Sequence, residues 1–183
     1  MPIDPGDRIL FMKVGIHAGE SLEDIVRRKR QEIADEGHAF WGYGGGTCHP
    51  RTMVQPFAAG SPSPIVLVMH PMVSKHFAEP VRADEFSEDG VNWAPVPSGI
   101  NCVGSRYALL LGDLEEVDEM VDLARTRVAV GPSAGRAGAS YIQGHADKAC
   151  LEVTDSPGAE AKEVAIGLRA TILKPFAVFL RNS

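Results

Sequence analysis

The chain has 183 residues, a formal net charge of −6, and 44% hydrophobic against 23% charged residues. A chain of this length can bury a core without disulfide bonds or metals, so we predict one globular domain over residues 1–183. Acidic residues outnumber basic ones by 24 to 18. This balance disfavours a general nucleic-acid binder, because such proteins need a basic surface that displaces counterions.

Cysteine spacing and hydropathy indicate the cellular context. Cys48, Cys102 and Cys150 form no C-x-x-C pair, so we expect reduced thiols rather than a disulfide framework or a zinc site. Residues 1–7 lack the basic and apolar segments of an export signal, and no apolar run reaches the roughly 18 residues of a membrane-spanning helix. We therefore expect a cytoplasmic protein with no membrane span.

The first predicted elements are a strand and a helix. The apolar run over residues 9–17 predicts a buried strand. Ser21 and Asp24 fit the S-x-x-[DE] capping pattern, and Gly37 is placed to end the helix that they begin. The apolar residues of this helix fall on one stripe, which predicts that this face packs on the core.

A glycine-rich and aromatic segment follows this helix. Residues 38–43 predict a second strand, after which residues 44–46 turn the chain toward a short helix that begins at Arg51. We expect Pro56 to end this helix, because proline removes a backbone hydrogen bond from a helix interior. Residues 64–69 then predict the most clearly buried strand of the chain.

The second half of the chain is predicted to be rich in strands. Asp89-Gly90 lies between two extended segments, which is a strong hairpin signal. Apolar residues at helical spacing predict a second main helix over residues 114–124. The other apolar runs predict strands over residues 106–111, 148–153, 164–173 and 176–180, the last two on either side of Lys174-Pro175.

These elements favour an α+β fold with two main helices and a small, strongly bent sheet or barrel, mixed or antiparallel. The order of an early strand, a helix, the aromatic strand Ala39-Phe-Trp-Gly-Tyr43 and later short strands resembles the PUA-like superfamily, which includes EVE and ASCH domains. The resemblance is one of layout and size and assigns no site residue. It implies a small β-barrel whose cleft receives a modified or flipped base, or another nucleotide-like group.

Three glycine-rich turns, over residues 44–52 (the first), 99–107 (the second) and 131–140 (the third), each carry an arginine and a hydroxyl group. Phosphate recognition uses backbone N–H groups, a hydroxyl and a forked guanidinium, so the recurrence predicts an anion-binding site where these turns meet. The alternative is that they are ordinary turns of a strand-rich domain. The residues expected to contact the ligand are Trp41, Tyr43, Gly44, Gly45, Gly46, Thr47, Arg51, Ser105, Arg106 and Arg136.

The aromatic residues just before the first turn have two interpretations. Trp41 and Tyr43 alternate across Gly42 and would share one face of a strand. Their rings could stack on a base of the ligand, or they could pack in the core like most large aromatic side chains.

A catalytic interpretation of the same segment makes Cys48 a nucleophile, with His49 or His38 as its base. Adjacent residues seldom point at each other, so a distant histidine such as His38 would have to serve, and the alternative is an ordinary buried thiol. The histidines show no metal-binding spacing, and we predict no metal and no cofactor.

Our first functional expectation is the binding of a nucleotide-like or other anionic small ligand, with no defined reaction. The second is an enzyme that uses Cys48 or a histidine at the same place. The third is a homo-oligomeric structural module, in which residues 176–180 could supply an edge strand to a homodimer.

Overall fold

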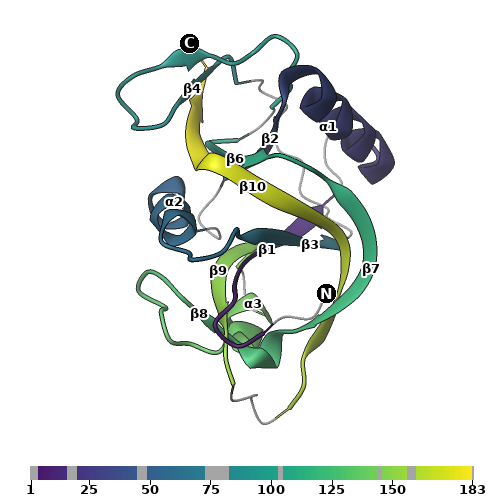
Figure 1. Cartoon of the computed structure of the whole chain (residues 1–183), viewed down its shortest axis with the longest axis vertical. Helices are drawn as coiled ribbons and strands as arrows, with labels where there is room; N and C mark the ends of the chain where they lie inside the picture. The colour runs from purple at the N-terminus through teal and green to yellow at the C-terminus, as the bar shows by residue number, and fades with distance from the viewer. Residues whose placement is uncertain are drawn as a thin grey trace.

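The structure is a computed structural model of the chain, and it describes residues 4–15, 20–44, 49–72, 83–102, 105–143, 146–155 and 160–182. Helices and one large mixed sheet form an α+β fold, as predicted (Figure 1). The helices are α1 (Leu22–Glu36), α2 (Arg51–Ala59) and α3 (Gly138–Gln143), with one 3₁₀ turn, η1 (Leu123–Arg125). The strands are β1 (Arg8–Gly15), β2 (Ala39–Tyr43), β3 (Val66–Met72), β4 (Glu85–Ser87), β5 (Ala94–Pro95), β6 (Tyr107–Leu111), β7 (Glu115–Asp122), β8 (Thr126–Val128), β9 (Lys148–Val153) and β10 (Glu163–Arg181).

The longest strand, β10, connects the two halves of the sheet. Its first half pairs with β3 and β7, and its second half pairs with β6 and β4. The register shifts between Ile172 and Ala177, around a proline that has no N–H to donate to the ladder. The sequence predicted two strands here, and the structure has one strand, which pairs with β6 on both sides of Pro175 but in a shifted register. Figure 1 shows β10, in yellow, running from β4 and β6 at the top toward β7 and β3.

The sheet is open. The order of its main strands is β2-β6-β10-β3-β1-β9-β8. Strands β1 and β3 run parallel, whereas β1 with β9 and β3 with β10 run antiparallel. No hydrogen-bonded pair joins β2 to β8 in the described residues, so the predicted barrel is not closed, and the 10-stranded sheet is larger than the small sheet we expected. Residues 177–179 pair with β6 and residues 179–181 with β4, so Phe179 has a strand on each side and the segment is not the free edge strand we expected; the homodimer stays a prediction.

Helix α1 begins and ends where its capping residues predicted. The Ser21 hydroxyl accepts from the backbone N–H of Asp24 at 3.1 Å. At the other end Gly37 adopts φ 78°, in the left-handed region that glycine tolerates, and its N–H donates to the Ile33 carbonyl. The capping contacts at both ends join residues three or four positions apart, which is why the capping pattern predicted where the helix begins and ends.

Helix α2 continues through Pro56 to Ala59, contrary to the expectation that proline would end it. A residue at this position would otherwise donate to the carbonyl of Thr52, and that bond is lost. Phe57 and Ala58, which follow the proline, are both buried in the main core cluster. Their burial outweighs the single lost hydrogen bond.

Residues 115–122 form strand β7, and the predicted helix over residues 114–124 is wrong. This strand pairs with β10, which is distant in sequence. The pairing places Arg169 of β10 against two acidic side chains of β7, at 2.8 Å from Glu115 and 3.3 Å from Glu119. Hydrogen bonds and ion pairs across the strands therefore override the helical spacing of the apolar residues.

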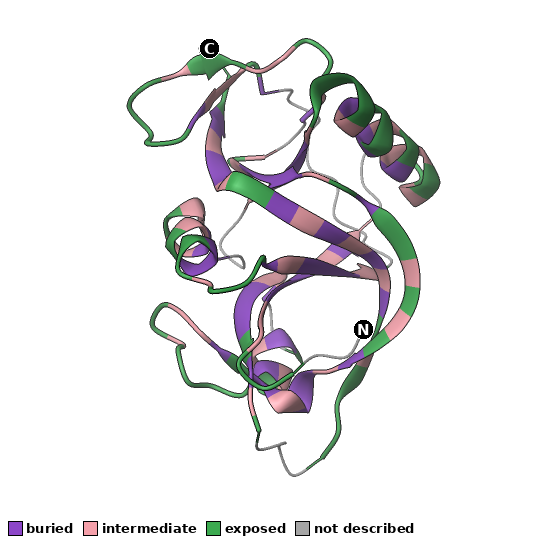
Figure 2. Ribbon diagram, in the orientation of Figure 1, coloured by how far each residue is buried: buried purple, intermediate pink, exposed green. Residues whose placement is uncertain are grey.

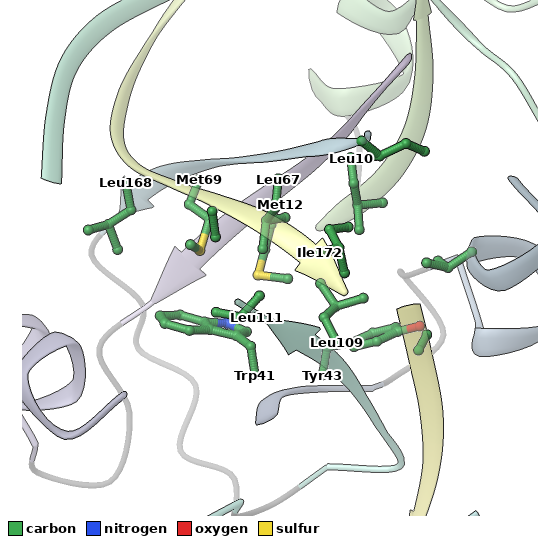
Figure 3. Close-up of a cluster of buried hydrophobic side chains, with 14 of the residues drawn as sticks. Leu10, Met12, Trp41, Tyr43, Leu67, Met69, Leu109, Leu111, Leu168 and Ile172 are labelled. Atoms are coloured by element: carbon green, nitrogen blue, oxygen red, sulfur yellow. The ribbon is translucent and has the colours of Figure 1, made fainter. Parts of the chain in front are cut away.

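Hydrophobic side chains pack on both faces of the sheet. Trp41 and Tyr43 face the cluster that contains Met12 and Met69, whereas Phe40 faces another cluster, as the alternation along a strand requires (Figure 3). Figure 2 shows that β1, β3 and much of β10 are buried, while the outer face of α1 and much of β7 are exposed. A hairpin forms between β4 and β5, as predicted, but Asp89-Gly90 lies within a longer loop over residues 88–93 rather than forming a tight turn between two strands.

A buried ion pair attaches α1 to residues 100–102. Lys29 and Glu32 are 4% and 2% exposed. The Lys29 ammonium donates to the two Glu32 oxygens at 3.0 and 2.8 Å and to the Asn101 carbonyl at 2.7 Å. Glu32 also accepts from the Asn101 N–H at 3.0 Å. Burial lowers the pKa of Lys29, an effect that the Glu32 carboxylate opposes.

Replacing one partner of this pair should destabilise the protein strongly. In Lys29→Met the Glu32 carboxylate stays buried without its main cation, which typically costs about 3–5 kcal/mol of unfolding free energy. Replacing both partners, in Lys29→Met/Glu32→Met, should cost less than the single change, because no uncompensated charge remains. Urea unfolding of the three proteins measures the difference.

The control is Arg27→Met, which breaks a pair at the same i,i+3 spacing on α1. Arg27 is 71% exposed and pairs with Asp24 in solvent, so its loss should move the unfolding midpoint far less. Equal losses in Lys29→Met and Arg27→Met would show that the buried pair does not hold α1 in place.

Candidate functional site

The second glycine-rich turn contacts the end of β2, and the third contacts α2. A Cβ on Gly44 would lie 3.2 Å from the backbone nitrogen of Arg106, which itself donates to the Tyr43 carbonyl at 3.2 Å. A Cβ on Gly131, in the third turn, would lie 3.0 Å from the sulfur of Met53. Figure 1 shows this third turn, between β8 and α3, beside α2. The second turn therefore packs against Tyr43 and Gly44, and the third packs against Met53.

Three aromatic rings form a row across neighbouring strands in this region. Tyr43 of β2 lies opposite Tyr107 of β6, which lies opposite Phe179 of β10, with ring centroids 5.3 and 5.9 Å apart. A cation lies over each end of this aromatic row. The Arg51 guanidinium carbon is 5.2 Å from the Phe179 ring, and the Lys148 ammonium is 5.6 Å from the Tyr43 ring. These contacts restrict the positions of both cations.

Arg51 is the first residue of α2, and the helix places it over β10. Its Nε donates to the Ala177 carbonyl at 3.3 Å, which leaves the two terminal nitrogens of the guanidinium with no protein partner among the described residues. The residue before it, Pro50, provides no side-chain cap to the helix. The N–H of Met53 donates to the Pro50 carbonyl at 2.9 Å, so only the N–H groups of Arg51 and Thr52 are open at this helix start among the described residues.

His49 is buried and its tautomer follows from its contacts. It is 5% exposed, and the backbone N–H of Cys150 donates to its Nδ1 at 3.0 Å. A backbone N–H can only donate, so Nδ1 carries no proton and the neutral ring holds its hydrogen on Nε2. That nitrogen lies 3.0 Å from the hydroxyl oxygen of Tyr141 and donates to it. Burial also lowers the pKa of His49, which favours this neutral form.

Tyr141 links this histidine to the third turn. The Arg136 guanidinium carbon lies 5.8 Å from the centroid of the Tyr141 ring, and the His49 ring lies on the same tyrosine at 5.6 Å. Arg136 is exposed while Tyr141 is half-buried. The tyrosine therefore joins a buried polar contact to a solvent-facing arginine.

The two histidines expected to act as bases have other surroundings. Both ring nitrogens of His49 are engaged, one of them by a backbone N–H, so this side chain joins the start of α2 to β9 rather than acting as a free base. His38 lies before β2, with Nδ1 3.2 Å from the Glu36 carbonyl and its ring 5.4 Å from Phe40. The expected nucleophile, Cys48, lies outside the described residues, as do Gly45, Gly46 and Thr47.

Trp41 and Tyr43 pack as core residues. They are 7% and 3% exposed, and Figure 3 shows the side chains of Met12 and Met69 pointing toward the Trp41 ring. Tyr43 contacts Tyr107 and Lys148. Protein atoms thus cover the faces that the stacking interpretation assigned to a ligand, and the core interpretation describes both residues.

The second turn contributes one exposed and one packed residue. Ser105 is half-buried, and its hydroxyl occupies the space where a side chain on Gly42 would lie; such a Cβ would also be 2.8 Å from the Cys102 sulfur. Glycine at position 42 is therefore required by close packing. Arg106 follows with an exposed side chain next to Gly44.

The three arginines predicted to contact a ligand differ in their ion pairing from the arginines of α1 and β10. Among the described residues, Arg51, Arg106 and Arg136 have no carboxylate within 4.0 Å. Arg8, Arg125 and Arg127 share this property. The arginines that do pair with carboxylates are Arg27, Arg28, Arg30, Arg169 and Arg181. In a chain with net charge −6, each of the three glycine-rich turns therefore brings an arginine that has no carboxylate partner among the described residues.

Four residues of this region were not among those predicted from the sequence to contact a ligand. They are Tyr107, Tyr141, Lys148 and Phe179, and each lies far along the chain from residues 44–52. Strand register brings the first and last of them into the aromatic row, and the His49–Cys150 contact brings β9 alongside. A local motif could not have identified them.

Comparisons with protein-family models, curated proteins and solved structures find no match to this chain. Within the described ranges, no group of three or more histidine, cysteine or acidic side chains could hold a metal ion. The described helices are also too short or too polar for any of them to span a membrane.

Lowering the pH should destabilise the protein through His49. The lowered pKa of His49 means that the folded protein keeps a neutral ring, while the unfolded chain takes up a proton near about pH 6.5. The contribution to stability is complete above about pH 6.5 and is lost as the pH falls toward the folded pKa, by at most about 1.4 kcal/mol per pH unit. Urea unfolding over this pH range measures the slope.

His49→Asn is the matched variant for this measurement. The asparagine oxygen can still accept from the Cys150 N–H, but the side chain does not titrate. The part of the slope that His49 causes should disappear in this variant. An unchanged slope would assign the pH dependence to other groups.

The two described cysteines should resist alkylation in the folded protein. Burial raises the pKa of the Cys102 thiol to about 11, and it raises the pKa of Cys150 further above its usual value. Thiolates are the reactive form, so iodoacetamide at neutral pH should label both residues much more slowly before than after unfolding in urea. Peptide mass spectrometry distinguishes the sites. Fast labelling of Cys102 would contradict its burial, and slow labelling of Cys48 would remove the nucleophile hypothesis.

Proposed function

We propose that this protein binds a small anionic, nucleotide-like ligand on the surface around the start of α2. The described residues of this surface are Gly44, Arg51, Arg106, Arg136, Tyr141 and Lys148. The observation that carries the proposal is that the second turn contacts Gly44 and the third contacts Met53 of α2, and that each of the three turns brings an arginine without a carboxylate partner among the described residues. No chemical step is part of the proposal.

The chemistry of this surface suits a phosphate or polyphosphate group. A guanidinium binds two oxygens of such a group at once, and the N–H groups at a helix start add further donors. Arg51 and Arg136 are already held over aromatic rings, so less side-chain freedom is lost when an anion binds than for free surface arginines. The rings of Trp41 and Tyr43 have no part in it, because both are buried.

The resemblance to PUA-like domains adds a base to the expected ligand. Domains of that superfamily are associated with modified or flipped bases, so a nucleotide is the first ligand to test. The open sheet differs from the small barrel that the resemblance implies. The resemblance therefore does not support the phosphate part of the proposal, which rests on the arginines.

Anion binding should raise the melting temperature, and two arginine variants should reduce the effect. We expect ADP or inorganic pyrophosphate at about 100 times Kd to add about 2.7 kcal/mol of stability, or roughly 5–10 °C. Arg106→Gln and Arg136→Gln should diminish this shift by weakening binding. Both side chains are exposed, so the melting temperature without ligand should change little. Differential scanning fluorimetry measures both quantities.

Arg27→Gln is the charge-matched control, since it removes an exposed arginine from α1. It should bind ADP and pyrophosphate like the wild type. The proposal is wrong if neither probe shifts the wild type, or if the two site variants and the control respond alike.

A further inference from the structure

The Tyr141 hydroxyl is a hydrogen-bond donor without an acceptor in the described protein. Its oxygen accepts from His49 Nε2 at 3.0 Å, and the direction of that bond follows from the Cys150 N–H that occupies Nδ1. Since His49 uses its only proton in this contact, it cannot accept the hydroxyl hydrogen. No other hydrogen bond of this hydroxyl is formed within the described ranges, so its hydrogen is available to a ligand.

The position of Tyr141 is set by the packing of α3. Ile142, the next residue, is 4% exposed and lies in the second core cluster, against which the Tyr141 ring also packs. The Tyr141 N–H donates to the Ala137 carbonyl at 3.1 Å, which fixes the start of this short helix. The phenol is thus held from two sides, by the core and by His49.

The same ring carries the Arg136 guanidinium at 5.8 Å. A guanidinium over the ring and a hydroxyl at its edge place two kinds of donor side by side, one charged and one neutral. An ionised oxygen is the acceptor that gains most from both, because hydrogen bonds to charged acceptors are about twice as strong as neutral ones. A phosphate group meets this requirement, whereas the base or sugar of a nucleotide does not.

We infer that the Tyr141 hydroxyl donates a hydrogen bond to the phosphate of the bound ligand, and that His49 holds this hydroxyl in its donating orientation. The inference rests on the proposed function and assigns to it a residue that lies in none of the predicted site positions. Tyr141 is a direct ligand contact, and His49 is a positioning residue that acts through it.

Tyr141→Phe tests the direct contact. The change keeps the ring that supports Arg136 and removes only the hydroxyl, so pyrophosphate should bind about tenfold or more weakly, the usual effect of losing one hydrogen bond to a charged group. Isothermal titration calorimetry well below the melting temperature measures the affinity of the folded protein. Ser140→Ala, which removes an exposed hydroxyl from the same helix, should leave the affinity unchanged.

The outcomes separate this inference from the proposed function. If Arg136→Gln weakens pyrophosphate binding but Tyr141→Phe does not, the inference is wrong and the proposed function stands. If the wild type binds neither pyrophosphate nor ADP, both are overturned. A weakening in Tyr141→Phe that Ser140→Ala does not share supports the inference.

A measurement on the wild type covers the case in which Tyr141→Phe does not fold. With ¹⁵N-labelled histidine, NMR should show His49 protonated on Nε2 alone. Pyrophosphate should shift this N–H signal, because a hydroxyl that donates to an anion becomes a stronger acceptor. Binding without any change at His49, or a proton on Nδ1, would overturn the inference.

Discussion

The structure depends on the hydrogen bonding of β10 with four other strands. This strand pairs with β3 and β7 up to Thr171, with β6 from Ile172 onward, and with β4 at its end. Both halves of the sheet therefore share one backbone, and the core clusters on either side of it are held in a common frame. Backbone donors and acceptors buried between layers must be paired, and a single long strand satisfies them for two sets of partners at once. The register after the proline also decides which side chains of β10 meet β6.

The proposed binding surface is a consequence of that register. Phe179 reaches Tyr107 because the second half of β10 pairs with β6, and Arg51 finds both its ring and its carbonyl partner on β10. His49 adds a second connection, between the start of α2 and the N–H of Cys150 on β9. The cations of the surface are thus held by ring faces and backbone carbonyls, and acidic side chains are paired with other arginines along α1 and β7. This separation explains how an acidic protein can present a basic surface locally.

Predictions from sequence succeeded where the determining interactions are local and failed where they are not. The ends of α1 follow from Ser21 and Gly37, each of which bonds within one turn. The strand β7 was predicted as a helix because its apolar spacing is helical, and its pairing with Arg169 on a distant strand could not be read from the segment. Pro56 was expected to end α2, but burial of the next residues stabilises the helix by more than the lost bond costs. Trp41 was assigned to a ligand, and its alternation with Tyr43 serves the core instead.

The sequence by itself determined the α+β class, the capped helix, the hairpin around Asp89-Gly90, most of the buried strands and the arginine content of three turns. Each of these depends on residues a few positions apart, whose backbone preferences act before any tertiary contact forms. Only the tertiary structure decided that the second turn contacts Gly44 and the third contacts Met53, that the sheet stays open, and that Tyr141 contacts His49 while Lys148 contacts Tyr43. These features depend on strand register and on contacts between segments far apart in the chain, and no local pattern encodes which distant backbone a strand will choose.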